Sequence, residues 1–204
     1  MKKNKLKTTV QGFAFLILVV MIGSGCALTI DQVDLGYMPQ QGVAIVNGAD
    51  KVAVTVTLMD ERSTKDKVSC KKNGYGMEMA AIVSTNDVAT LVSDAIIIEL
   101  RNRGFKINEG RVAIKIELTK FYNDFKIGAW SGSAAAEVAC SVQVKKPDGN
   151  INYAKAITGM YTEKGIQLCS GKNAKVALEG ALKNAIAKLM QDEDFIKAIL
   201  QAGS

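Results

Sequence analysis

The stretch RVAIKIELT at residues 111–119 decides the fold class, because apolar and other residues alternate along it. One side carries Val112, Ile114, Ile116 and Leu118. A period of two is typical of a β-strand with one buried face. The alternation ends after Thr119, and we expect a bend around Tyr122-Asn123-Asp124. The stretch therefore predicts a sheet that buries only one of its faces.

Other stretches repeat this alternation. Residues 135–145 and 151–161 flank Pro147-Asp148-Gly149-Asn150, which is a turn by composition, so they predict a hairpin. Residues 51–58 predict an earlier strand, and residues 77–83 a short one. The pattern indicates several strands that pair mainly with their neighbours in sequence.

A helix is expected between the early and the later strands. Ser84 with Asp87 fits a capping box at its start, although Asn86 is an alternative cap. Apolar residues then recur near a period of 3.6, and the isoleucine run at residues 96–98 widens the apolar face. Gly104 follows as a left-handed C-cap. A helix with this pattern packs on a sheet.

The C-terminal part predicts two more helices. Residues 172–190 carry an apolar stripe with small residues, and the acidic run at residues 192–194 opens a short last helix. Both main helices must bury a face, and each strand offers one. We therefore expect an α+β fold: a two-layer sandwich of an antiparallel sheet with two main helices packed on one face, plus a short C-terminal helix.

The N-terminus, MKKNKLKTTVQGFAFLILVVMIGSGC at residues 1–26, resembles a secretory signal. Lysines come first, an apolar run spans about residues 13–22, and small residues precede Cys26. The run is about half of the roughly 20 apolar residues that cross a bilayer. Ser24-Gly25-Cys26 resembles a bacterial lipobox, although Gly23 stands where leucine is usual. A plain cleaved signal is the alternative.

The lipobox resemblance implies a lipid anchor. The Cys26 thiol would carry a diacylglycerol, cleavage would follow Gly25, and the new amine would take an N-acyl chain; several chains make anchoring stable. Ala27, in place of aspartate, resembles lipoproteins sorted to the outer membrane. We expect a lipoprotein signal peptide at residues 1–25, a lipidated N-terminus and tether at 26–50, and a single periplasmic domain at 51–204.

Composition narrows the function class. The formal charge is +6, and subtracting the four lysines of residues 1–25 leaves +2, which does not predict a nucleic-acid partner. The chain has no histidine, so the commonest general base and metal ligand are absent and a Ser-His-Asp triad is impossible. The acidic clusters at residues 60–61 and 192–194 favour structural roles. We expect no catalytic, cofactor-binding or metal-ligating residues, and no enzyme.

Three cysteines remain besides Cys26. Lys67, Lys71 and Lys72 surround Cys70 in sequence and would lower its pKa if they lay close, which leaves a reactive thiol open. Cys140 shares a strand face with valines and is expected to be a buried, inert thiol. The oxidising periplasm permits one disulfide, with Cys169 the more natural partner, but the spacing does not choose the pair.

Aromatic residues gather near a glycine-rich bend at residues 128–132. They are Phe121, Tyr122, Phe125 and Trp130. Packing of the sheet edge is the favoured interpretation, and an exposed aromatic rim for a partner is the alternative.

With these elements placed, the chain resembles the YajG family of bacterial lipoproteins. The colinear features are Asp60-Glu61-Arg62, Arg103-Gly104-Phe105, residues 118–124 and the closing helices from Lys172. The resemblance implies a lipid-anchored domain on the periplasmic face of the outer membrane, without an accepted activity. We expect a non-enzymatic binding or envelope-maintenance module whose sheet edge or helix–sheet groove takes an envelope protein. An accessory subunit of an envelope transport or assembly complex is the alternative.

Overall fold

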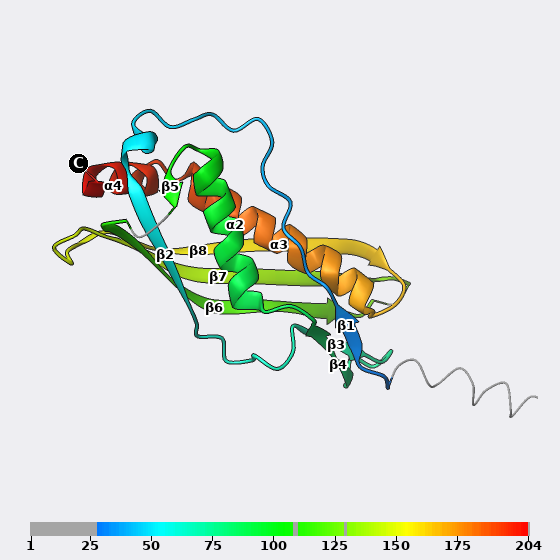
Figure 1. Cartoon of the computed structure of the whole chain (residues 1–204). Helices are drawn as coiled ribbons and strands as arrows, with labels where there is room; N and C mark the ends of the chain where they lie inside the picture. Colours follow the sequence, from blue (N-terminus) through cyan, green and yellow to red (C-terminus); the bar gives the residue numbers. More distant parts are fainter. Residues whose placement is uncertain (1–27, 108–109, 129, 204) are drawn as a thin grey trace, which may run out of the picture.

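The structure, a computed structural model, describes residues 28–107, 110–128 and 130–203 (Figure 1). Helices α2 (Val88–Asn102) and α3 (Gly171–Gln191) lie on one face of an eight-stranded sheet, and α4 (Glu193–Gly203) follows α3 at one end. The predicted α+β sandwich is confirmed, including both main helices and the short C-terminal one. The predicted signal peptide and Cys26 lie outside the described residues.

Three long antiparallel strands form the centre of the sheet: β6 (Val112–Lys126), β7 (Gly132–Lys145) and β8 (Ile151–Ile166). The bend expected at residues 122–124 is wrong, because β6 continues through it. A β-bulge between Leu118 and Lys120 shifts the alternation by one residue. Odd-numbered residues such as Phe121 therefore face the core beyond the bulge, where even-numbered ones did before it.

The other edge of β6 is shared by two strands. They are β2 (Ala53–Asp60) and β3 (Ser69–Lys72), both parallel to β6. Outside them lie β5 (Lys106–Ile107) next to β2, β4 (Glu78–Ser84) next to β3, and β1 (Asp31–Val33) next to β4. Parallel pairs thus join the antiparallel ones, so the sheet is mixed and not purely antiparallel as predicted, and it forks beside β6.

The segment expected to be a tether is part of the fold from Asp31 onward. Strand β1 pairs with β4, and Leu35 is buried. Asn86 exchanges two hydrogen bonds with the Leu35 main chain, of 3.1 Å and 2.8 Å, so it is not the helix cap. Asp87 caps α2 and accepts the Thr90 N–H at 2.6 Å, so the capping box predicted from Ser84 is wrong: Ser84 Oγ donates to Asn86 instead. The sequence predicted a tether here because β1 has only three residues, too few to show alternation.

A buried ion pair holds the middle of that segment. Glu99 lies in the last turn of α2, Arg103 follows the end of the helix one turn later, and both are buried. Glu99 Oε1 accepts the Tyr37 hydroxyl at 2.8 Å and the Gln40 N–H at 2.7 Å. Residues 37–40 are thereby fixed against α2. A 3₁₀ turn, η2 (Ala49–Lys51), then leads into β2.

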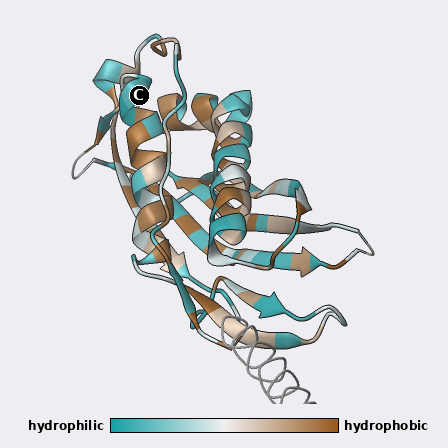
Figure 2. Cartoon of the chain, turned by 90° about the vertical axis from the view of Figure 1, so that its right-hand side faces the viewer, coloured by the Kyte–Doolittle hydropathy of each residue, from teal (hydrophilic) through white to brown (hydrophobic). Residues whose placement is uncertain are grey.

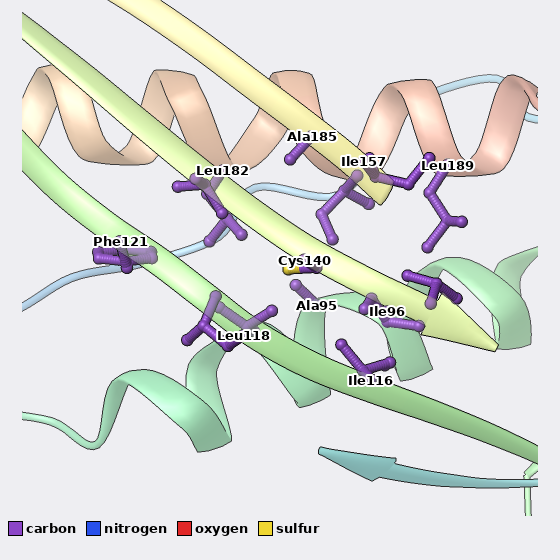
Figure 3. Close-up of a cluster of buried hydrophobic side chains, with 14 of the residues drawn as sticks. Ala95, Ile96, Ile116, Leu118, Phe121, Cys140, Ile157, Leu182, Ala185 and Leu189 are labelled. Atoms are coloured by element: carbon purple, nitrogen blue, oxygen red, sulfur yellow. The ribbon is translucent and has the colours of Figure 1, made fainter. Parts of the chain in front are cut away.

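The core lies between the helices and the sheet (Figure 3). Its members include Ala95 and Ile96 of α2, Leu182, Ala185 and Leu189 of α3, and Ile116, Leu118, Phe121, Cys140 and Ile157 of the long strands. Helix α3 approaches β8 so closely that a Cβ on Gly159 would lie 2.2 Å from Ala181 O and from Ala185 N. Only glycine allows this contact. None of the described helices is long and apolar enough to cross a membrane.

Candidate functional site

A short gap in the sheet lies beside β6, between the end of β2 and the start of β3. Pairing with β2 ends at Leu118, and pairing with β3 begins at Asn123. In the described chain, residues 119–122 therefore have no strand neighbour on this side. The gap opens into a hollow of about 390 Å³, which we call the β6 slot. Its lining is Arg62, Ser63, Thr64, Thr119, Lys120, Phe121 and Tyr122.

An ion pair closes the β2 end of the β6 slot. Arg62 donates from Nε to Asp60 Oδ1 at 2.9 Å and from Nη2 to Oδ2 at 2.8 Å, a bidentate contact. The Arg62 hydrogen bond lowers the pKa of Asp60 in spite of burial. Arg62 is buried, and its Nη1 has no hydrogen-bond partner among the described residues. The pair fixes the loop that follows β2.

A buried polar pair closes the β3 end. Ser69 Oγ donates to Asn123 O at 2.8 Å and accepts Asn123 Nδ2 at 2.9 Å. The Asn123 N–H donates to Val68 O at 2.9 Å. Both side chains are fully buried, so these bonds fix β3 on β6. No sequence pattern pointed to this pair, because its members are 54 residues apart.

The sheet face that the helices leave open carries paired charges around Tyr122. Lys120 pairs with Glu137 at 2.7 Å, and Lys67 with Glu78 at 3.0 Å. Tyr122 is half-buried, and burial raises the pKa of its hydroxyl. This arrangement favours contact with polar and aromatic groups of another chain rather than acid–base chemistry at neutral pH.

The structure places Cys70 in β3, buried, with its thiol donating to Ala80 O at 3.2 Å. Burial raises the pKa of Cys70 in spite of Lys67 nearby. Lys71 pairs with Asp31, and Lys72 pairs with Asp124. The hypothesis that its lysine neighbours lower this pKa is therefore wrong, and a protonated thiol is a poor nucleophile.

The other two described thiols are also free. Cys140 lies buried in β7, as expected, and burial raises its pKa to about 12. Cys169 is half-buried before α3, and burial raises its pKa too. No disulfide joins the three cysteines that the structure describes.

The aromatic cluster predicted from sequence divides in two. Phe121 and Phe125 are buried against the helices, so the packing interpretation holds for them. Trp130 is 94% exposed in the loop between β6 and β7. The bulge in β6 decides which aromatic residues turn inward.

The predicted acidic clusters have structural contacts. Asp192 Oδ2 accepts Tyr153 Oη at 2.9 Å and Lys155 Nζ at 2.8 Å, and its Oδ1 accepts the Asp194 N–H at 3.1 Å. Glu61 is exposed next to Asp60. Across the described ranges, no group of three or more His, Cys, Asp or Glu side chains is placed to hold a metal ion.

The outer edge of β8 is partly covered. Lys188 Nζ donates to Thr158 O at 2.7 Å, and Asn184 Nδ2 donates to Met160 O at 2.8 Å. Side chains of α3 thus occupy main-chain acceptors that a partner strand would need. The β6 slot, whose lining includes the exposed Ser63, Thr119 and Lys120, is the better candidate for contact with a partner.

One family model matches most of this chain. A family model described as an uncharacterized lipoprotein matches residues 39–200. A Xanthomonas campestris protein of known crystal structure is 13% identical, with a TM-score of 0.54, covering 85% of this chain and 96% of that chain. A minor lipoprotein from Acinetobacter baumannii is 6% identical, with a TM-score of 0.44 over 72% and 95% of the two chains. No curated protein matches this chain. At 13% identity, the Xanthomonas structure shows a shared fold alone.

Proposed function

This chain belongs to a family of uncharacterised lipoproteins, and from that premise we propose that acyl chains on Cys26 anchor a non-enzymatic binding module at the periplasmic face of the outer membrane. The anchor would be a diacylglycerol on the thiol and an acyl chain on the amine, enough for stable attachment. The lipobox-like Ser24-Gly25-Cys26 supports the position, and Ala27 supports outer-membrane sorting.

We further propose that this chain is a YajG-like lipoprotein. Asp60-Glu61-Arg62 supports this, since its first and third residues form the bidentate pair beside the β6 slot. Arg103-Gly104-Phe105 supports it as well, because Gly104 ends α2 with a φ of 95° and Phe105 is buried.

The observation that carries the binding proposal is the unfilled edge of β6. Asn123 directs its N–H toward β3, and main-chain direction alternates along a strand, so the Phe121 main chain faces the slot. Phe121 itself is buried, so its main chain is not accessible for strand pairing. An extended segment of a partner protein would instead lie in the hollow against the exposed Ser63, Thr119 and Lys120. Lys120 and Tyr122 would contact its side chains from the open face. The slot spans only residues 119–122, so it suits a short segment.

The anchor is tested by the intact mass of the protein purified from membranes, and by cell fractionation of a Cys26→Ser variant. We expect a mass that includes acyl chains on a chain beginning at Cys26, and release of the variant from the membrane fraction. A mature mass without acyl chains would exclude the anchor.

The slot is tested by site-specific photo-crosslinking in intact cells. A photoreactive amino acid at the exposed Ser63 should capture a partner protein, while the same group at the exposed Asp148, in the turn between β7 and β8, should not. Equal crosslinking at both positions, or none at Ser63, would contradict the proposal. A captured subunit of an envelope transport or assembly complex would favour the accessory-subunit function. Cys70→Ser should leave the crosslink unchanged, because the binding module needs no thiol.

A further inference from the structure

We infer that one end of the domain, at which the described chain begins with Leu28, rests on the phospholipid surface and inserts its exposed aromatic and aliphatic side chains among the headgroups. We call it the anchor end; it comprises residues 28–30, 73–77, 127–131 and 167–170, except Ala129. The inference deepens the proposed function, because it rests on the anchor at Cys26.

Strand directions bring these segments to one end. Strands β6 and β8 both run antiparallel to β7, so residues 127–131 and 167–170 follow at the same end. Strand β3 runs parallel to β6, which brings residues 73–77 there too. Strand β1 runs parallel to β4 and away from this end, so residues 28–30 lead toward it. Figure 1 shows this end on the right, and Figure 2 faces it.

Large apolar side chains are exposed on every one of these segments. They are Trp130 (94%), Tyr75 (91%), Leu168 (73%), Leu28 (63%), Ile30 (63%) and Met77 (58%). Single exposed apolar residues are normal, but a group of them on separate segments at one end indicates a contact surface. None of the six belongs to the hydrophobic core.

The short stretch of chain between Cys26 and β1 indicates that a lipid surface covers the anchor end. Ile30 is four residues after Cys26, so at most about 14 Å separate the two along the chain. The polar layer on each side of a bilayer is itself about 5–8 Å thick. An acylated Cys26 therefore holds the anchor end at the headgroups, with no chain left to let the domain stand away from them.

The chemistry of the anchor end suits a lipid surface. Tryptophan and tyrosine concentrate at membrane interfaces, where their rings bury an apolar body and keep a polar tip wet. Lys126 and Lys164 are exposed just behind the tips, each beside Ser133 of β7, and can contact anionic phosphates. The nearby acids Glu78 and Asp124 are already paired with lysines.

The test uses Trp130 as the reporter, since it is the only tryptophan of the chain. Acylated protein is reconstituted in vesicles of phosphatidylethanolamine and phosphatidylglycerol, with or without bromine on the acyl chains. We expect emission at a shorter wavelength than in the vesicle-free Cys26→Ser protein. Bromination should lower the Trp130 emission, because a tryptophan at the membrane interface lies close to the acyl chains.

The matched control moves the reporter to the far end. In a Trp130→Phe, Ile151→Trp chain, the tryptophan replaces an exposed residue at the start of β8, and bromination should leave its emission unchanged. Intact mass of the same sample separates the two proposals. Protein that carries acyl chains but keeps a water-exposed, unquenched Trp130 would overturn this inference and leave the anchor standing. Protein without acyl chains would remove the anchor, and this inference with it.

Discussion

Glu99 in the last turn of α2 and Arg103, the residue that follows the helix, form an ion pair in the interior of the domain, with side chains 0% and 8% exposed. Arg103 Nη2 also donates to Gln40 Oε1 at 2.9 Å, while Glu99 accepts Tyr37 and the Gln40 main chain. Two buried charges thus compensate each other and fasten residues 37–40.

Removing one charge should therefore destabilise the domain strongly. We expect Glu99→Leu to lower the free energy of unfolding by about 3–5 kcal/mol, because Arg103 is left buried without its counter-charge. The double variant Glu99→Leu, Arg103→Met should recover much of the loss. Urea unfolding measures both, and Glu193→Ala, which breaks the exposed pair with Lys197, is the control with a change of roughly 0.5 kcal/mol or less. A Glu99→Leu loss no larger than the control's would contradict this account.

Asp31 joins β1 to two other parts of the fold. Its Oδ1 lies 2.7 Å from Lys71 Nζ, and its Oδ2 accepts the Gly171 N–H at 2.7 Å. We expect Asp31→Ala to cost about 1–3 kcal/mol, because the Gly171 donor loses its partner at the start of α3. Hydrogen exchange should also speed up at the β1 amides. The exposed neighbour Asp34 provides the control: Asp34→Ala should change stability by about 0.5 kcal/mol or less.

The contact between α3 and β8 has no room for a side chain at Gly159. We expect Gly159→Ala to lower stability by at least about 1–3 kcal/mol, because the helix backbone must move away from the strand. Gly74→Ala is matched to it in chemistry, and nothing lies within 4 Å of the added Cβ. Thermal unfolding of the two variants should differ clearly, and equal midpoints would contradict the close contact.

Stability should be flat between about pH 5 and 8 and fall below about pH 4. The flat range follows from the absence of histidine. Hydrogen bonds from Arg62 lower the pKa of Asp60, and those from Lys155 lower the pKa of Asp192, in spite of burial. A lowered folded pKa stabilises the fold above the unfolded value of about 3.9, and this stabilisation is lost as pH falls through the folded value. Urea midpoints measured across this range check the profile, and a maximum near pH 4 would contradict it.

The three described thiols should react with a maleimide at different rates in the native protein. Cys169 is half-buried and should react first, whereas Cys70 and Cys140 are buried and should react only after opening of the fold. Mass spectrometry counts the labels with and without urea. Rapid labelling of Cys70 in the native protein would contradict its burial and support a reactive thiol.

Local patterns predicted the long elements well. Alternation identified β2, β7 and most of β8, because each strand buries one face over several residue pairs. The apolar stripes identified α2 and α3, because each helix buries one face over two or more turns. The end of β6 was missed since the bulge after Leu118 changes which residues face inward. Beyond the bulge, the apolar residues continue to alternate but at odd-numbered positions, and in the sequence this shift resembles the end of a strand.

Pairing over long distances could not be read locally. Strands β1 and β3 have three and four residues, too few for a recognisable pattern. Their pairing with β4 and β6 becomes known only from the structure. The β6 slot depends on where β2 and β3 separate, so no motif marks it. Arg62 was visible as half of a pair with Asp60, but not as the wall of a hollow.

The bond between Asp31 and Gly171 also sets an order of events during synthesis. These residues are 140 positions apart, so Asp31 is made long before the Gly171 N–H that donates to it exists. Strand β1 can pair with β4 earlier, but its bond to the start of α3 forms only after nearly the whole polypeptide has been made. An enzyme that processes the chain at Cys26 would therefore meet residues near Asp31 before they are bound to α3. The bond between Asp31 and Gly171 would form only afterwards.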